Sequence, residues 1–149
     1  MNRAYVSDVL AHDVDTVWST LGDFHGVATW IAMVRDNAPE GGTGRADVGA
    51  VRVLTLEPDG QLIRERLVAY NAVDRTQSYE VDGALPYGMT EFLGTLRVSP
   101  ITATGDTFLE WYCDFSCATD DTARIRETMR SVYTEFVVNL RQHLQVANT

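Results

Sequence analysis

The chain has 149 residues, of which 45% are hydrophobic and 22% charged, a balance typical of one globular domain with its own core. Its net charge is −9, and all twelve of its basic residues are arginines. So acidic a protein makes a poor partner for nucleic acid or an anionic membrane, and the composition argues against both classes. We expect a single domain over residues 1–149, present as a monomer or a homodimer.

The sequence predicts neither a targeting segment nor a metal site. Residues 1–8 reach an acidic side chain before an apolar signal region develops, and no run approaches the roughly 18 apolar residues of a membrane span. We therefore expect a cytoplasmic protein. Cys113 and Cys117 lie four apart in an extended run, about 13 Å between Cα atoms, which is too far for a disulfide. The three histidines have no metal-binding spacing.

The N-terminal part of the chain predicts one strand and two short helices. Residues 4–10 have the composition of a strand, and Asp13 follows as the cap of a helix with apolar residues at helical spacing. Asp23 is placed to cap a second helix that runs towards Trp30, and Gly22 separates the two. Two helices this short do not form a bundle by themselves.

The middle of the chain predicts six further strands. Turn residues separate short strand-like runs, and Pro58-Asp59-Gly60 is one such turn. Loops of hairpin length imply an antiparallel sheet. The expected strands are residues 33–37, 50–56, 62–70, 77–81, 89–98 and 107–117.

A long amphipathic helix is expected over residues 119–146. Thr119 or Asp120 can cap its start, and its apolar residues recur at steps of three or four. Such a helix after a set of strands indicates an α+β domain in which a curved antiparallel sheet grips the helix. The space between helix and sheet is then the expected place for a small molecule. The apolar stripe consists of Ile125, Met129, Val132, Phe136, Leu140 and Leu144.

Strand alternation indicates which side chains face that space. In the run 89–98, Phe92 belongs to the apolar phase and faces inward. In the run 62–70, the apolar phase contains Glu65, which would need a partner or acquire a raised pKa suited to acid–base chemistry. The alternative is a different register that leaves Glu65 in solvent.

The run 107–117 allows two phases. Hydropathy places Trp111 inward and leaves Glu110 and Tyr112 in water, whereas a bulge would turn part of the strand around. We keep both phases open. Aromatic residues at the ends of elements or on the helix often border a cavity, and Tyr87 is one of them. The candidate ligand-binding residues are Trp30, Phe92, Glu110, Trp111, Tyr112, Met129, Tyr133 and Phe136.

Particular residues recur along nearly the whole chain in a recognisable order and spacing. They are residues 17–18, 21–24, Trp30, 49–52, 54–56, 65–67, 85–86, 95–98 and 110–111. Together with the order of the elements, they resemble the START or Bet v1-like (SRPBCC) superfamily, and within it most closely the bacterial polyketide cyclase/dehydrase-like branch. The resemblance implies a helix-grip fold, in which a seven-stranded antiparallel sheet wraps the C-terminal helix and encloses a cavity for apolar or amphipathic ligands.

A more distant resemblance is to plant abscisic-acid receptors, which share this fold. It implies that Arg35 stands where those receptors have a ligand-binding lysine, and that Glu65 and Glu110 are pocket glutamates. The Ser-Gly-Leu-Pro-Ala gate of the receptors is missing from the turn at residues 58–60, so a receptor role is not expected. The His-Pro pair frequent in the cyclase-like branch is also missing, because Trp30 is followed by Ile-Ala.

Two functions follow as hypotheses. The first is a cofactor-independent cyclase or dehydratase-like enzyme for a polyketide-type or other apolar carbonyl compound. In it Glu65, paired with Arg35, removes a proton next to the carbonyl, and Tyr87 donates a hydrogen bond. The second is a binding or carrier protein that holds a hydrophobic small molecule without chemistry. Both place an apolar ligand in the cavity.

Overall fold

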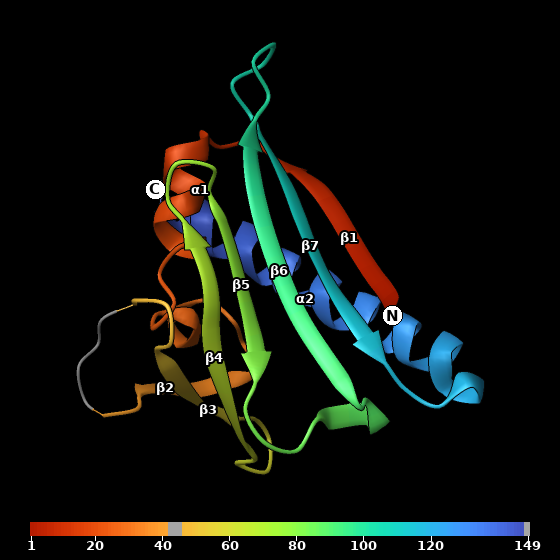
Figure 1. Cartoon of the computed structure of the whole chain (residues 1–149). Coiled ribbons are helices and arrows are strands. Elements are labelled where there is room, and N and C mark those ends of the chain that lie inside the picture. The colour runs from red at the N-terminus through yellow and green to blue at the C-terminus, as the bar shows by residue number, and fades with distance from the viewer. Residues whose placement is uncertain (42–45, 148–149) are drawn as a thin grey trace.

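A computed structural model describes residues 1–41 and 46–147 of the chain, and its strands form one antiparallel sheet (Figure 1). The sheet has seven strands in the order β1-β7-β6-β5-β4-β3-β2, so only the pairing of β1 with β7 joins elements far apart in sequence. The strands are β1 (Asn2–Leu10), β2 (Val34–Pro39), β3 (Val51–Leu56), β4 (Leu62–Asn71), β5 (Thr76–Val81), β6 (Glu91–Pro100) and β7 (Thr107–Ser116).

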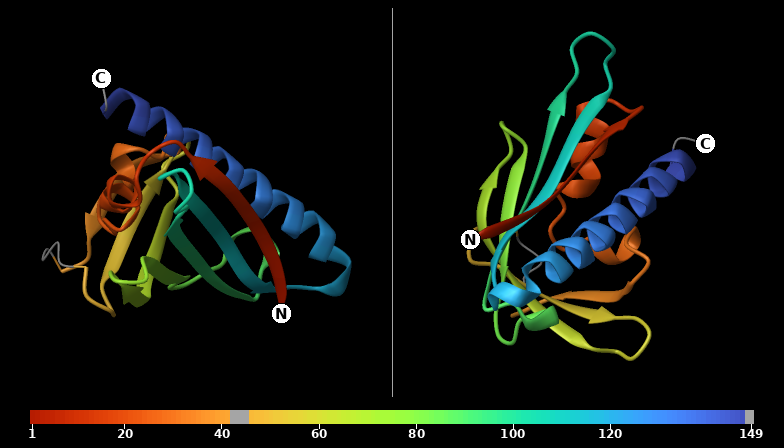
Figure 2. Two further views of the ribbon diagram at one scale, coloured as in Figure 1. Left: turned by 90° about the horizontal axis from the view of Figure 1, so that it is seen from above. Right: turned by 90° about the vertical axis from the view of Figure 1, so that its right-hand side faces the viewer.

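The long helix α2 (Thr122–Ala147) lies along one face of this sheet. Both views in Figure 2 show α2 crossing that face obliquely, with the N-terminal helical segment covering one end of the same face. The expected helix-grip fold, an α+β architecture with seven antiparallel strands around a C-terminal helix, is thereby confirmed. Among the described residues no helix is long and apolar enough to cross a membrane.

Helix α1 (Val14–Leu21) begins and ends where the sequence indicates. The Asp13 carboxylate accepts hydrogen bonds from the backbone N–H and the hydroxyl of Thr16, as an N-cap does, and Gly22 ends the helix. The second expected helix is only the 3-10 turn η1 (Val27–Thr29). Glycines on both sides of Asp23 disfavour an α-helix in this segment, and Gly26 has no side chain to cap it.

Helix α2 starts three residues later than expected, after the 3-10 turn η3 (Thr119–Asp121). Its apolar surface is wider than a single stripe. One row is buried against the sheet, while Val132 and Phe136 lie on the flank of that row and are only half-buried. This flank borders the space between helix and sheet. The buried residues of α2 are Ile125, Met129, Tyr133, Val137, Asn139, Leu140 and Leu144.

Two polar contacts hold the C-terminal half of α2 in place. The side-chain oxygen of Asn139 accepts a hydrogen bond of 2.8 Å from the backbone N–H of Ala32, which follows η1. The guanidinium of Arg141 forms an ion pair with Asp8 on β1. These contacts connect α2 to the segment after η1 and to β1, and they hold the helix in position over the space between helix and sheet.

The strand phases follow the hydropathy pattern except near two register shifts, one in β2 between Val34 and Asp36 and one in β4. Strand β7 pairs with β1 and β6 without a register shift, so its alternation stays regular from end to end. In β4 the register shifts between Leu67 and Ala69, and Ala69 is exposed although the apolar phase would place it inward. The turn at residues 58–60 joins β3 to β4 as expected. Part of the expected loop 39–44 lies outside the described residues.

Candidate ligand-binding site

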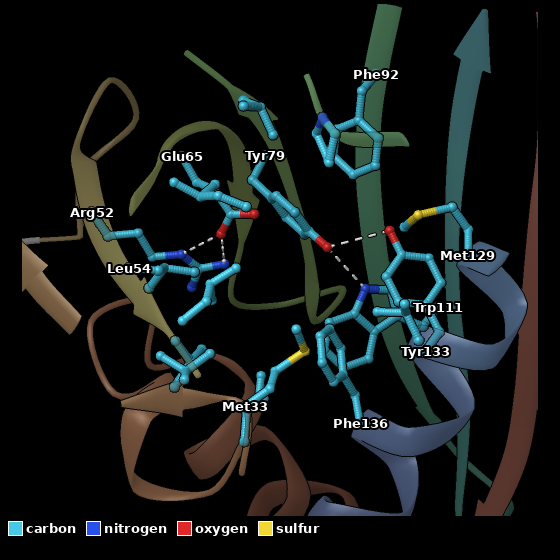
Figure 3. Close-up of a pocket in the computed structure, with 18 of the residues that line it drawn as sticks. Met33, Arg52, Leu54, Glu65, Tyr79, Phe92, Trp111, Met129, Tyr133 and Phe136 are labelled. Atoms are coloured by element: carbon cyan, nitrogen blue, oxygen red, sulfur yellow. Dashed lines mark hydrogen bonds and ion pairs between the residues drawn. The ribbon is translucent and has the colours of Figure 1, made fainter. Parts of the chain in front are cut away.

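A cavity of about 270 Å³ lies between α2 and the inner face of the sheet (Figure 3). Apolar and aromatic side chains from the sheet, from α2 and from the η1 region form most of its wall, and few polar groups interrupt them. Ligand sites in proteins have this composition. The wall includes Leu21, Trp30, Met33, Leu54, Leu56, Ile63, Val81, Phe92, Leu96, Trp111, Met129, Val132, Tyr133 and Phe136.

A buried ion pair forms one side of this cavity. Arg52 on β3 lies directly opposite Glu65 on β4, and its Nη2 and Nε are 2.7 and 2.8 Å from Glu65 Oε1. The Arg52 and Glu65 side chains are only 5% and 12% exposed. Arg52 also donates to the backbone oxygen of Phe24 and stacks on that ring at 4.2 Å. The cation is thus fully partnered, as a buried charge must be.

A cluster of aromatic polar groups faces this ion pair across the cavity. The indole N–H of Trp111 donates a 3.1 Å hydrogen bond to the hydroxyl of Tyr79, and that hydroxyl lies 3.4 Å from the hydroxyl of Tyr133 on α2. Burial raises the pKa of both tyrosines well above the ordinary value, and the Glu65 carboxylate raises the pKa of Tyr79 further. Both phenols therefore stay protonated and can donate hydrogen bonds.

Gly94 on β6 allows the Tyr79 ring to take this position. The two residues are directly opposite each other in the sheet. A Cβ atom built on Gly94 would lie 2.5 Å from Cζ and 2.8 Å from the hydroxyl oxygen of Tyr79. Only a residue without a side chain lets the ring lie across the strand and reach Trp111. Figure 3 shows Tyr79 between the ion pair and the Trp111–Tyr133 side.

Most of the side chains expected in the pocket do line the cavity. Glu65 is among them, so its inward phase is correct. Tyr87 lies at the edge, 43% exposed, in the short turn η2 (Pro86–Gly88), and its backbone oxygen accepts from Arg124. The other expected residues on the wall are Trp30, Phe92, Trp111, Met129, Tyr133 and Phe136.

The expected pairing of Arg35 with Glu65 is wrong. Arg35 lies on β2 where the register with β3 shifts between buried Val34 and Asp36, and its side chain is exposed there. There it pairs with Glu57 at 2.9 Å, and both side chains are about half exposed. Glu65 does have a cationic partner, but it is the guanidinium of Arg52 on β3 rather than that of Arg35 on β2.

Glu110 and Tyr112 also lie outside the cavity. Because β7 has no bulge, the hydropathy phase holds, and Trp111 faces inward while its two neighbours face the other way. Glu110 accepts a 2.7 Å hydrogen bond from the Tyr5 hydroxyl, and Tyr112 stacks on the Tyr5 ring. The Arg3 guanidinium lies over Tyr112. These residues form a polar cluster on the outer face of the sheet.

Three important wall residues were not predicted, namely Arg52, Gln77 and Tyr79. The signal for Arg52 was available, because counting outward from the turn at residues 58–60 pairs it directly with Glu65. Gln77 and Tyr79 alternate with polar neighbours along β5 and share one face. Within residues 1–41 and 46–147, no group of three or more His, Cys, Asp or Glu side chains is placed to hold a metal ion.

Comparison with known proteins agrees with this architecture. A protein from Nitrosospira multiformis has 28% sequence identity and a TM-score of 0.80, with 96% of each chain covered. XoxI from Bacillus cereus has 24% identity and a TM-score of 0.83, with 100% of this chain and 99% of that chain covered. Ginseng major latex-like protein 151 from Panax ginseng shares the fold at 18% identity and a TM-score of 0.72, covering 98% and 96%.

A search of curated proteins finds no match. The family model described as polyketide cyclase/dehydrase and lipid transport, by contrast, matches residues 1–145. That match spans every strand of the sheet and nearly all of α2, including all of the residues that form the cavity wall. The chain therefore belongs to the polyketide cyclase/dehydrase and lipid transport family.

Proposed function

We propose that this protein binds a small, largely apolar molecule of about bicyclic size in the cavity between α2 and the sheet. The observation that carries the proposal is the cavity of about 270 Å³ with a mostly apolar wall. An apolar cavity of about 150 Å³ is enough to hold benzene, so this one has room for roughly ten to twelve non-hydrogen atoms. The aromatic side chains of Trp30, Trp111 and Phe136 offer flat surfaces for such a molecule.

Filling the cavity tests this proposal. Val132→Phe, on the flank of α2 that lines the cavity, should weaken binding of a naphthol by about tenfold or more, measured by titration calorimetry. Val138→Phe is the matched control, because Val138 is on the same helix but 40% exposed, and it should bind as the wild type does. Equal affinities of the two variants would contradict binding at this place. Native mass spectrometry of the purified protein would show any molecule that copurifies.

A second candidate function is cyclisation and dehydration of an apolar carbonyl compound. It is favoured by Glu65, the single acidic side chain among the described residues that line the cavity. In this reaction the Glu65 carboxylate takes a proton from the carbon next to a carbonyl group, and the electron pair moves onto the carbonyl oxygen. The Tyr79 hydroxyl, which burial keeps protonated, donates a hydrogen bond to that oxygen. The enolate carbon then attacks a second carbonyl carbon and closes a ring, and the oxygen of that carbonyl takes the proton held by Glu65. The resulting hydroxyl leaves as water together with a second proton from the attacking carbon, as a carbon–carbon double bond forms.

The Arg52–Glu65 pair gives this candidate its main constraint. The guanidinium already binds the carboxylate on one oxygen, so proton transfer must use the other oxygen or loosen the pair. A substrate that spans the cavity would have Glu65 at one side and the Tyr79 hydroxyl towards the other, as Figure 3 shows. Arg52 would then orient the base and balance the charge of the site.

A nitrobenzisoxazole tests whether Glu65 acts as a base. This bicyclic probe opens to a coloured phenolate once its carbon-bound proton is removed, so turnover is read by absorbance. Glu65→Gln should lower turnover by about tenfold or more while the probe still binds. Glu57→Gln changes a carboxylate of the exposed pair and should leave turnover as it is. Unchanged turnover in Glu65→Gln would remove Glu65 from the mechanism and leave ligand binding as the function.

A further inference from the structure

Two buried polar atoms in the cavity wall have no hydrogen-bond partner within the described parts of the chain. One is the side-chain oxygen Oε1 of Gln77, a residue 2% exposed on the inner face of β5. The other is the indole nitrogen Nε1 of Trp30, a residue 6% exposed beside η1. Both residues line the 270 Å³ cavity. Two residues of the same cavity wall thus each carry one unpaired buried atom, an acceptor and a donor.

The neighbouring polar groups of the wall, by contrast, have partners. Trp30 and Trp111 have their ring centroids 6.1 Å apart, yet the indole N–H of Trp111 donates to Tyr79 while that of Trp30 donates to no described residue. Arg52 and Glu65 are likewise partnered. Folded proteins rarely leave buried polar groups unpaired, because each one loses its hydrogen bonds to water without replacement. Both unpaired atoms therefore require an explanation.

The sheet register and one ring contact place Gln77 and Trp30 near the same part of the cavity wall. Gln77 lies directly opposite Leu96 on β6, and Leu96 lies directly opposite Trp111 on β7. With neighbouring strands about 4.8 Å apart, the Cα atoms of Gln77 and Trp111 are about 10 Å apart across the inner face. The Trp30 ring packs on the Trp111 ring. A bicyclic molecule lying over Leu96 and Trp111 has the two residues with unpaired atoms beside it.

We propose that Gln77 and Trp30 select a ligand with a hydroxyl group on its apolar ring system. This inference builds on the proposed binding function. The ligand hydroxyl donates its hydrogen to Gln77 Oε1, and a ligand oxygen accepts from the Trp30 N–H. A ligand that lacks the hydroxyl hydrogen leaves Oε1 unpaired and is rejected, because a site made to bind a hydroxyl discriminates strongly against its absence.

A probe series tests this inference on the wild-type protein. Calorimetry compares naphthalene, the two naphthols and the matching methoxynaphthalenes, which have nearly the same shape. Naphthalene has no polar group, a naphthol has a hydroxyl that can donate and accept, and a methoxynaphthalene has an oxygen that can only accept. We expect at least one naphthol to bind about tenfold or more tightly than naphthalene and than its own methyl ether. Affinities within about threefold across the series would overturn the inference and leave the binding function standing. Absence of binding by every probe would overturn both.

The same substitution at two glutamines assigns the preference to Gln77. Gln77→Met keeps a similar volume and removes the amide, so it should bind a naphthol no more tightly than naphthalene. Without ligand it should melt a few degrees higher than the wild type, since an unpaired buried group is gone. Gln145→Met is the control, because Gln145 is exposed on α2 and does not line the cavity, and the naphthol preference should persist. If Gln77→Met melts lower and weakens all probes equally, Gln77 has a structural role and the inference fails.

Trp30→Phe tests the donor side. It removes the indole N–H and keeps an aromatic ring against Trp111. The naphthols and the methoxynaphthalenes should each weaken by about threefold or more, whereas naphthalene should bind as before. A uniform loss of affinity for all probes would show that only the shape of Trp30 matters and would contradict its role as donor.

Discussion

Two arginine–glutamate pairs in this protein have nearly the same geometry and opposite surroundings. Arg52 and Glu65 are 2.7 Å apart with side chains 5% and 12% exposed, whereas Arg35 and Glu57 are 2.9 Å apart with side chains 49% and 46% exposed. The first pair lies on the inner face of the sheet and lines the cavity. The second lies in solvent. The inner pair alone has low-dielectric surroundings, so only there does charge strongly affect stability and chemistry.

The difference arises from the local register of the two strands. Arg52 shares the inward phase of Leu54 along β3, while Arg35 lies at the register shift between Val34 and Asp36 on β2, where both Arg35 and Asp36 are exposed. The register thus decides whether an arginine enters the cavity or stays in water. The resemblance on which the choice of Arg35 depended carries no such information.

Breaking the inner pair should give the largest effect. Glu65→Ala removes the carboxylate partner of the buried Arg52 guanidinium, which then keeps only its hydrogen bond to the backbone oxygen of Phe24. We expect the free energy of unfolding to fall by about 3–5 kcal/mol, the usual cost of an uncompensated buried charge. Urea unfolding followed by tryptophan fluorescence measures this. A loss below about 1 kcal/mol would show that water reaches Arg52 and that the pair is not buried in solution.

Alkaline pH should reveal the buried phenol beside that pair. Burial, with help from the Glu65 carboxylate, raises the pKa of Tyr79, while the unfolded phenol titrates near its ordinary value of about 10. Above about pH 10 the unfolded state therefore loses its proton first, and stability falls as the pH rises. Tyr79→Phe should remove about 1.4 kcal/mol of the stability that the wild type loses between pH 9 and pH 11, measured by urea unfolding at the two pH values. An unchanged slope would place the Tyr79 hydroxyl in contact with solvent.

Breaking the outer pair should give the smallest effect. Glu57→Ala removes the partner of Arg35, but both side chains are about half exposed and water replaces the lost contact. The expected change in the free energy of unfolding is about 0–1 kcal/mol, by the same urea measurement. A loss as large as that of Glu65→Ala would remove the contrast between the two pairs.

Much of the fold was predictable because it depends on periodicity. The N-cap at Asp13, the turn at residues 58–60, the antiparallel strands and the apolar stripe of α2 are all local patterns. The bulge after Leu67 and the replacement of the second helix by η1 were not predictable in this way. Each depends on how neighbouring strands and loops meet, which a single segment of sequence does not record.

The site was predictable where hydropathy alone decides the phase. Trp111 and Phe92 were placed correctly because each belongs to an apolar phase of its strand. Glu110 and Arg35 were misplaced because both were assigned by resemblance. For Glu110 the hydropathy phase pointed the other way, and for Arg35 the phase was not considered. The hydrogen bond of Trp111 to Tyr79 brings together residues 32 positions apart, so no local pattern could predict it.

The residue at position 94 influences the shape of the cavity without lining it. Gly94 does not line the cavity, but the Tyr79 ring occupies the volume that a side chain there would fill. Any larger residue at position 94 would turn the Tyr79 ring, break its hydrogen bond with the Trp111 N–H and change the shape of the cavity wall. A change in ligand preference can thus begin with one methyl group on a residue that does not contact the ligand.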